Sequence, residues 1–100
     1  MITLGERAVK KIKKMNINSL YINIEYRQGP CNDNLCRMIP VVYVSLRPEG
    51  VKYYLIYDVE IKVFVSDNLY RSIIRHRDQI RLDFSPLRKK FVVSGFTYAF

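Results

Sequence analysis

The sequence predicts an α+β fold in which mostly antiparallel or mixed β-sheets carry two helices. Apolar residues recur at helical spacing in two short segments and alternate with polar residues in most of the remainder. Most of the connections are of hairpin length, which favours antiparallel neighbours. At 100 residues, 49% of them hydrophobic, the chain is expected to form a single domain over residues 1–100 with a modest core.

The first helix is predicted close to the N-terminus. Its buried stripe would consist of apolar residues three or four positions apart: Leu4, Ala8, Ile12 and Met15. Thr3 and Glu6 have the spacing of a capping box, in which the threonine hydroxyl accepts a hydrogen bond from the Glu6 backbone N–H. The helix is therefore expected to begin just after Thr3.

Three strands are predicted directly after the first helix, and a fourth is predicted before the second helix. Alternation indicates a strand over Leu20–Arg27. The segment Ile39–Arg47 is apolar on both faces, which predicts a central or doubly covered strand with Pro40 among its first residues. The tight-turn signal Pro48–Gly50 joins it to Val51–Tyr57, so these two strands are expected to be antiparallel neighbours.

The second half repeats the alternation of strand and helix patterns. A strand is predicted over Glu60–Ser66, and Ser66 with Asp67 supplies N-cap chemistry for a second helix. The buried stripe of that helix would be Leu69, Tyr70, Ile73 and Ile74. Two last strands, Gln79–Ser85 and Phe91–Phe96, flank a polar turn. The predicted order is helix, four strands, helix, two strands.

Both cysteines lie in Gln28–Pro40, the longest expected irregular connection. Loops supported by a rigid sheet often carry binding chemistry. Cys31 and Cys36 can close a disulfide, ligate a metal ion or cluster, act in thiol redox chemistry, or be inert. Metal sites generally need four ligands, so an all-cysteine site would require a second chain. His76 is expected to be a surface or capping residue at a helix end.

Several segments resemble the HesB-like domain, the fold of the A-type iron–sulfur cluster assembly proteins, and in particular its small CC/Se-motif relatives. The resemblance lies in ITLGERAVKKI, SLYINIEY, QGPC, DVEIKVFVSDNLYRSI, IRLDF and KKFVVSG. Cys31 resembles the family's loop cysteine. The family's C-terminal Cys-x-Cys pair is absent, because the chain ends VSGFTYAF, and the adjacent cysteines of the CC/Se proteins are here separated by NDNL.

The resemblance implies handling of an iron–sulfur cluster or a metal ion through Cys31 and Cys36. It also implies a homodimer that bridges the metal site, and iron–sulfur donor or recipient proteins as partners. In such a protein the two thiols of each chain would be the only cysteine ligands.

The alternative is a basic module that binds nucleic acid or another protein and contains a structural cysteine pair. The net charge is +8, and four cations share the polar side of the first helix: Arg7, Lys10, Lys11 and Lys14. These cations can bind phosphates or simply face water. Tyr53, Tyr54 and Tyr57 can stack on bases or pack at half-buried sheet positions.

Other function classes find little support. One histidine and the lack of a P-loop or a G-x-S-x-G motif lead us to expect no enzyme. The N-terminus resembles no signal peptide, and the longest apolar run, Met38–Val44, is far shorter than the ~20 residues of a membrane span. A cytoplasmic protein without a membrane partner is expected. The abundance of Tyr, Ile, Lys and Arg is typical of thermophiles.

Overall fold

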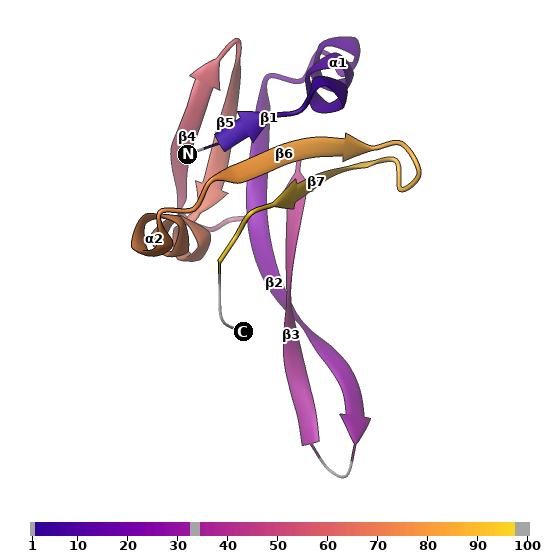
Figure 1. Ribbon diagram of the computed structural model, residues 1–100, viewed down its shortest axis with the longest axis vertical. Coiled ribbons are helices and arrows are strands. Elements are labelled where there is room, and N and C mark those ends of the chain that lie inside the picture. The colour runs from indigo at the N-terminus through magenta and orange to yellow at the C-terminus, as the bar shows by residue number, and fades with distance from the viewer. Residues whose placement is uncertain (1, 33–34, 98–100) are drawn as a thin grey trace.

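The computed structural model describes residues 2–32 and 35–97, except for the side chains of residues 30–32 and 35–37. Two helices and two sheets occupy this part of the chain (Figure 1). The elements in chain order are β1 (Ile2–Leu4), α1 (Glu6–Met15), β2 (Ser19–Asn32), β3 (Leu35–Ser45), β4 (Tyr53–Val59), β5 (Ile61–Ser66), α2 (Asp67–His76), β6 (Ile80–Ser85) and β7 (Lys90–Ser94). The predicted α+β class is confirmed. The elements come in the predicted order, with one additional strand, β1, before the first helix.

The larger sheet has the strand order β3-β2-β5-β4. β2 is antiparallel to β3 and parallel to β5, and β4 is antiparallel to β5. The expectation that β3 and β4 are neighbours is wrong, since they form opposite edges. The central places belong to β2 and β5, which carry the fully buried side chains Ile22, Val63 and Val65. The strand order is thus decided by the burial of apolar side chains on the core face and not by the short turn between β3 and β4.

The edge position of β3 also changes the interpretation of Pro40. The sequence predicted a central strand that begins near this proline, yet β3 begins at Leu35 and Pro40 pairs with Tyr26 in its middle. That prediction is wrong in both respects. An edge strand tolerates proline because the N–H groups on its outer side have no neighbouring strand to which they could donate.

The smaller sheet has the order β1-β6-β7. β6 and β7, which correspond to the two last predicted strands, are antiparallel neighbours, whereas the parallel pairing of β1 with β6 was not predicted. This pairing places Thr3 in a strand, so the predicted capping box is wrong. The N-cap of α1 is Gly5, which makes no side-chain bond, and its N–H donates to the Leu82 carbonyl at 2.8 Å. The backbone around Thr3 pairs with β6, so it does not adopt the geometry that a capping box requires.

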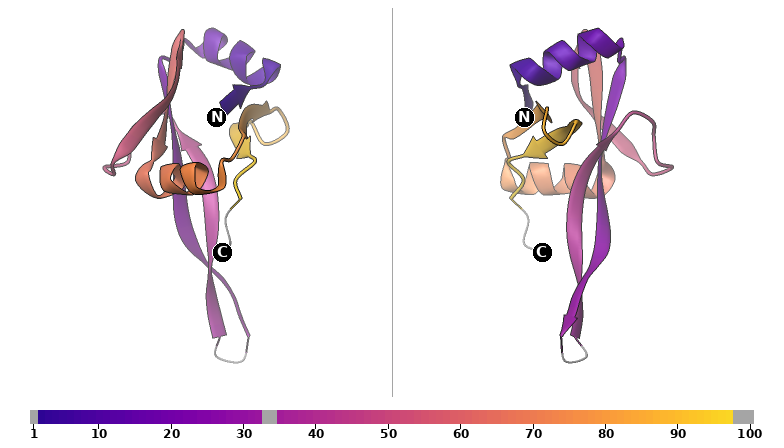
Figure 2. Two further views of the ribbon diagram at one scale, coloured as in Figure 1. Left: turned by 60° about the vertical axis from the view of Figure 1, so that its left-hand side comes forward. Right: turned by 90° about the vertical axis from the view of Figure 1, so that its right-hand side faces the viewer.

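Both helices and the smaller sheet cover one face of the larger sheet (Figure 2). One core cluster joins Ile22 of β2 to Leu69 and Ile73 of α2. A second cluster joins Ala8 and Ile12 of α1 to elements of both sheets. The predicted stripes of the helices are confirmed at these residues, whereas Met15 and Ile74 are about half exposed, at 47% and 51%. Among the described residues, no helix lies on the other face of the larger sheet (Figure 2).

The distal halves of β2 and β3 project from this body as a two-stranded hairpin (Figures 1 and 2). We call residues 26–32 and 35–40 the arm. Seven residues of strand extend about 23 Å, a large share of the molecule's 49 Å long axis. Large apolar side chains of the arm are about half exposed, since Tyr26, Ile39 and Met38 are 52%, 46% and 58% exposed. The irregular connection predicted between Gln28 and Pro40 is therefore wrong, because strand pairing continues almost to its tip.

Within the described residues, no helix combines the length and the apolar character that crossing a membrane requires.

Candidate functional site

The two cysteines are cross-strand partners in the arm. The register pairs Cys31 with Cys36, and the next pair toward the tip is Asn32 with Leu35. Their backbone is described, whereas their side chains lie outside the described part of the structure. Directly opposed residues of an antiparallel pair have Cα atoms about 4.5–5.5 Å apart. The fold thus brings together the two thiol-bearing residues that sequence alone placed in one loop.

This backbone separation suits more than one thiol chemistry. Two thiolates that each lie 2.3 Å from a tetrahedral metal ion are about 3.8 Å apart, which opposed strand positions allow. A disulfide also fits, since its Cα atoms are usually about 4.4–6.8 Å apart. The register places both cysteines directly opposite each other in one hairpin. Either chemistry would use them as a unit.

A bulge precedes the cysteine pair. Gln28 pairs with Met38 and Cys31 with Cys36, so residues 29–30 of β2 oppose a single residue of β3. Pro30 has no N–H to donate, and it falls where the ladder is already interrupted. A bulge bends and twists the strand that carries it. The proline is accommodated here without loss of the cysteine register beyond it.

Other metal ligands do not gather elsewhere in the described residues, where no group of three or more His, Cys, Asp or Glu side chains could hold a metal ion. His76 is the last residue of α2, and its Nδ1 lies 3.0 Å from the Ser72 carbonyl. The predicted capping position is confirmed. A single chain therefore offers one cysteine pair, in the arm, and further cysteine ligands would have to come from another chain.

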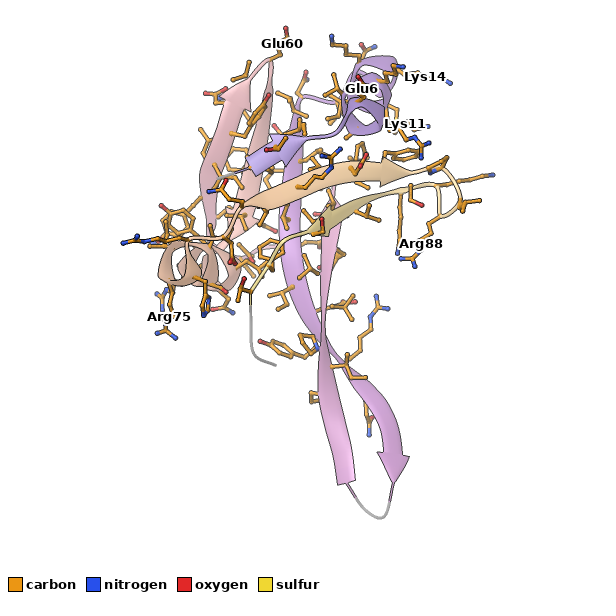
Figure 3. All side chains as sticks on the ribbon, viewed as in Figure 1. Glu6, Lys11, Lys14, Glu60, Arg75 and Arg88 are labelled. Atoms are coloured by element: carbon orange, nitrogen blue, oxygen red, sulfur yellow. The ribbon has the colours of Figure 1, made fainter. Side chains whose placement is uncertain are left out.

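The cations of α1 form the second candidate site. Arg7, Lys10, Lys11 and Lys14 line one shallow depression of about 330 Å³ together with Phe84 and Pro86. The Lys11 ammonium lies 5.0 Å from the centre of the Phe84 ring. Lys11 and Lys14 project from the same side of the molecule as Arg88, which lies in the β6–β7 turn (Figure 3). We call the four α1 cations and this turn the basic surface.

Sequence reasoning found the helix half of the basic surface and missed the rest. The contribution of Phe84, Pro86 and Arg88 depends on β6 passing beside α1. The signal in the sequence was weak: a run of three cations, Arg88–Lys90, that spans the β6–β7 turn and the first residue of β7. Its relation to α1 is a consequence of tertiary packing.

The predicted tyrosine cluster is divided by the sheet. Tyr54 stacks on Tyr70 of α2 with ring centres 4.2 Å apart, and Tyr57 packs against both core clusters. Tyr53 is on the opposite face, where it meets Tyr21 edge to face at 5.0 Å. Of the two alternatives for these tyrosines, packing at half-buried sheet positions is confirmed. A single surface for stacking on bases is not formed, because consecutive strand residues alternate between faces.

The outer face of the larger sheet contains a polar network. Asn23 is only 3% exposed, and its amide donates to the Ser45 hydroxyl at 2.9 Å. The Tyr53 hydroxyl donates to Asn23 Oδ1 and accepts from the Glu49 backbone N–H at 2.9 Å. These bonds tie the 46–52 connection to the sheet.

Two ionisable groups beside this network have shifted pKa values. Burial, followed by the negative charges of Glu49 and Glu25, raises the pKa of the Tyr43 phenol above its ordinary value. A hydrogen bond with the Tyr54 side chain raises the pKa of Lys52. Lys52 therefore stays charged, and Tyr43 stays neutral, over the physiological range.

No protein-family model and no curated protein sequence matches the chain. Among solved structures, the chain is similar to one described as the crystal structure of IscA with the [2Fe-2S] cluster. The two share 13% sequence identity and a TM-score of 0.47, over 95% of this chain and 82% of that one.

Proposed function

We propose that this protein binds a metal ion or an iron–sulfur cluster through Cys31 and Cys36, and that two chains share the cargo. One observation carries the proposal: the register sets the two cysteines directly opposite each other near the tip of a projecting arm. A pair of opposed thiolates supplies half of a tetrahedral sulfur site. The other half would come from a second copy in a symmetric dimer.

The location of the pair suits the transfer of cargo better than its permanent storage. Structural metal sites are usually enclosed by the core that they stabilise. The cysteines instead lie in a hairpin that reaches away from the body, where neighbouring side chains such as Tyr26 and Met38 are more than half exposed. A ligand at this position is accessible to a donor or recipient protein. The proposed role is thus binding and delivery rather than catalysis.

The test is metal loading of the whole protein. Reduced protein is incubated anaerobically with zinc, or with ferrous iron and sulfide, and the bound metal is measured per chain by native mass spectrometry. We expect one zinc ion per two chains, and a thiolate-to-iron absorption band in the iron sample. Cys31→Ser and Cys36→Ser should each abolish loading, whereas His76→Ala should load normally because His76 lies on α2.

A count of free thiols in denatured, non-reduced protein completes the test. Two free thiols per chain are expected for a ligand pair. Absence of free thiols in freshly purified protein, together with failure of the reduced protein to retain zinc or iron, would leave a structural disulfide as the role of the pair.

A second function, binding of nucleic acid, is favoured by the geometry of the basic surface. Arg7, Lys10 and Lys14 are exposed and share one depression with the half-buried Lys11. Positions at these spacings lie on one helix face over about 10 Å. Such a row contacts phosphates without reading base sequence.

Salt dependence distinguishes this second function from a merely solvated face. If all four cations contact duplex phosphates, the logarithm of the binding constant should fall with the logarithm of salt with a slope of about −3.6. A Lys10→Gln, Lys14→Gln variant should reduce the slope by about 1.8. The matched control is Lys62→Gln, Arg75→Gln, which removes two exposed cations elsewhere. Equal slopes for the two variants, or no binding at low salt, would refute the function.

A further inference from the structure

The turn between β6 and β7 exposes a leucine among cations. Leu87 is 95% exposed, the highest value among the large apolar side chains of the described residues. It is followed directly by three exposed cations, Arg88, Lys89 and Lys90. Isolated apolar residues are common on protein surfaces. The residues around Leu87 therefore decide whether it has a role.

The turn holds Leu87 in an ordered conformation. Ser85 pairs with Lys90 across the ladder, so the connection has only the residues 86–89. Within it the Arg88 N–H donates to the Ser85 hydroxyl at 3.3 Å, and Lys89 has a left-handed backbone with a φ of 54°. Pro86 fixes a further backbone angle. A ligand that covers Leu87 thus meets a turn that is already ordered, which lowers the entropic cost of binding.

An apolar strip leads from Leu87 toward α1. Pro86, its neighbour in the sequence, and Phe84 form the apolar part of the depression that contains the four α1 cations. The Phe84 ring is half-buried and meets Phe91 edge to face, with ring centres 5.3 Å apart. The Lys11 ammonium lies 5.0 Å from the centre of the Phe84 ring. We call Phe84, Pro86 and Leu87 the apolar strip.

Cations border the apolar strip on two sides. In the view of Figure 3, Lys11 and Lys14 lie above the β6–β7 ribbon, and the Arg88 side chain extends below it. The acidic residues of α1, β6 and β7 are Glu6 and Asp83. Neither lines the depression, and Asp83 is already in an ion pair. The positive charge beside the apolar strip is therefore available to an anionic ligand.

This arrangement matches a single strand of nucleic acid better than a duplex. A duplex stacks its bases on one another, so their apolar faces are hidden, whereas a single strand presents unstacked bases beside its phosphates. Surfaces that bind single strands combine cations along the backbone with side chains on which bases pack. A flat anionic membrane could take up Leu87 but could not reach Phe84, which is half-buried in the depression.

We propose that the basic surface binds single-stranded nucleic acid, with bases packed on the apolar strip and phosphates along the cations of α1 and the turn. The proposal rests on nucleic-acid binding, the second function proposed above, and names the form of nucleic acid that this surface takes. One base would stack on Phe84 as Lys11 moves from the ring to a phosphate. A neighbouring base would cover Leu87.

The test compares two fluorescent probes with the full chain at low salt: oligothymidylate of about ten nucleotides and a hairpin duplex with a stem of the same length. We expect the single strand to bind at least about tenfold more tightly. Leu87→Ser should weaken single-strand binding about tenfold, because a leucine that binding buries is lost. Leu55→Ser, the matched control, removes a 46% exposed leucine of β4 and should bind as the wild type does.

The ring and the turn cations give two further readouts. Phe84→Leu keeps an apolar side chain at the half-buried position and should weaken single-strand binding about fivefold, because a stacking surface is lost. Replacing Arg88, Lys89 and Lys90 by Gln should reduce the slope of log binding constant against log salt by about 2, since each phosphate contact to a single strand contributes about 0.7.

The outcomes separate this inference from the function on which it rests. If neither probe binds at low salt, nucleic-acid binding itself is absent and the inference falls with it. Salt-dependent binding in which the duplex binds as tightly as the single strand, or in which Leu87→Ser equals Leu55→Ser, would keep the function and overturn the inference. Vesicles of phosphatidylcholine with about one third phosphatidylserine complete the comparison. If vesicle binding depends on Leu87 and single-strand binding does not, the apolar strip serves a membrane surface and the inference is overturned.

Discussion

The body and the arm are built from the same two strands but are stabilised differently. In the body, Ile22 of β2 is fully buried between the sheet and α2. Four residues later, Tyr26 is 52% exposed, and beyond it the strands are supported mainly by each other. A lone two-stranded hairpin is marginally stable in water. The cysteines therefore belong to the least supported part of a firmly packed molecule, where a ligand can alter local geometry at low cost.

The largest expected contrast comes from matched truncations of isoleucine. Ile73→Ala removes a side chain that is 1% exposed in the core, and should lower the free energy of unfolding by about 2–5 kcal/mol. Ile39→Ala, in the arm at 46% exposure, should cost less than about 1 kcal/mol. Denaturant unfolding followed by circular dichroism measures both. Similar losses at the two sites would show that the arm is part of the cooperative core.

A smaller effect should locate the boundary between the two regions. Tyr53→Phe removes the partner of Asn23 Oδ1, and Asn23 is almost fully buried just before the arm begins. An orphaned buried acceptor should cost about 1–3 kcal/mol in the same denaturant experiment. Tyr70→Phe keeps the ring that stacks on Tyr54 and serves as the control. A loss no larger than that of the control would mean that the polar network does not hold the root of the arm.

Shortening the arm should change stability still less. Because Arg27 pairs with Ile39, residues 28–38 can be replaced by Asn-Gly, which favours a two-residue hairpin turn. We expect the free energy of unfolding to stay within about 1 kcal/mol of the wild-type value, because few buried contacts are lost. Metal loading should disappear entirely. A shortened protein that fails to fold would contradict the division into body and arm.

The smallest effect concerns pH at Tyr43, near the root of the arm. The pKa of its phenol is raised in the folded protein, so the unfolded chain releases that proton first as pH rises through about 10. The stability contribution of this group is complete below that pH and declines above it. Between pH 10 and 11, Tyr43→Phe should lose stability less steeply than the wild type in denaturant titrations. Parallel slopes would show that Tyr43 titrates alike in both states.

Local patterns were sufficient to predict most elements. The 3.6-residue stripe that contains Ala8 and Ile12, and the alternation that contains Ile80 and Leu82, are confirmed as a helix and a strand with those residues buried. Both patterns record which side of an element faces apolar neighbours. β1 was missed because three residues are too few to show a period, and its pairing with β6 is long-range in sequence.

The candidate sites, too, were predicted only where their residues are close in the sequence. The cations of α1 were predicted from helical spacing alone, since their relation is local. Phe84 and Arg88 could not be assigned to the same surface, because their proximity to α1 depends on how the two sheets pack. A pocket of about 390 Å³ on the outer face of the larger sheet was not predicted either. It needs Tyr43 of β3, Glu49 of the connection and Ser66 of β5, which meet only when β2 lies between β3 and β5.

By itself, the sequence determined the α+β class, the two amphipathic helices and the fact that each chain has only two thiols to offer. These follow from composition and from periodicities that neighbouring residues enforce on one another. Tertiary structure alone decided that β2 and β5 run parallel at the centre, that β3 and β4 are edges, and that Cys31 faces Cys36 across a ladder. Strand order depends on which apolar faces can be buried together, a property of the whole chain that short segments do not contain.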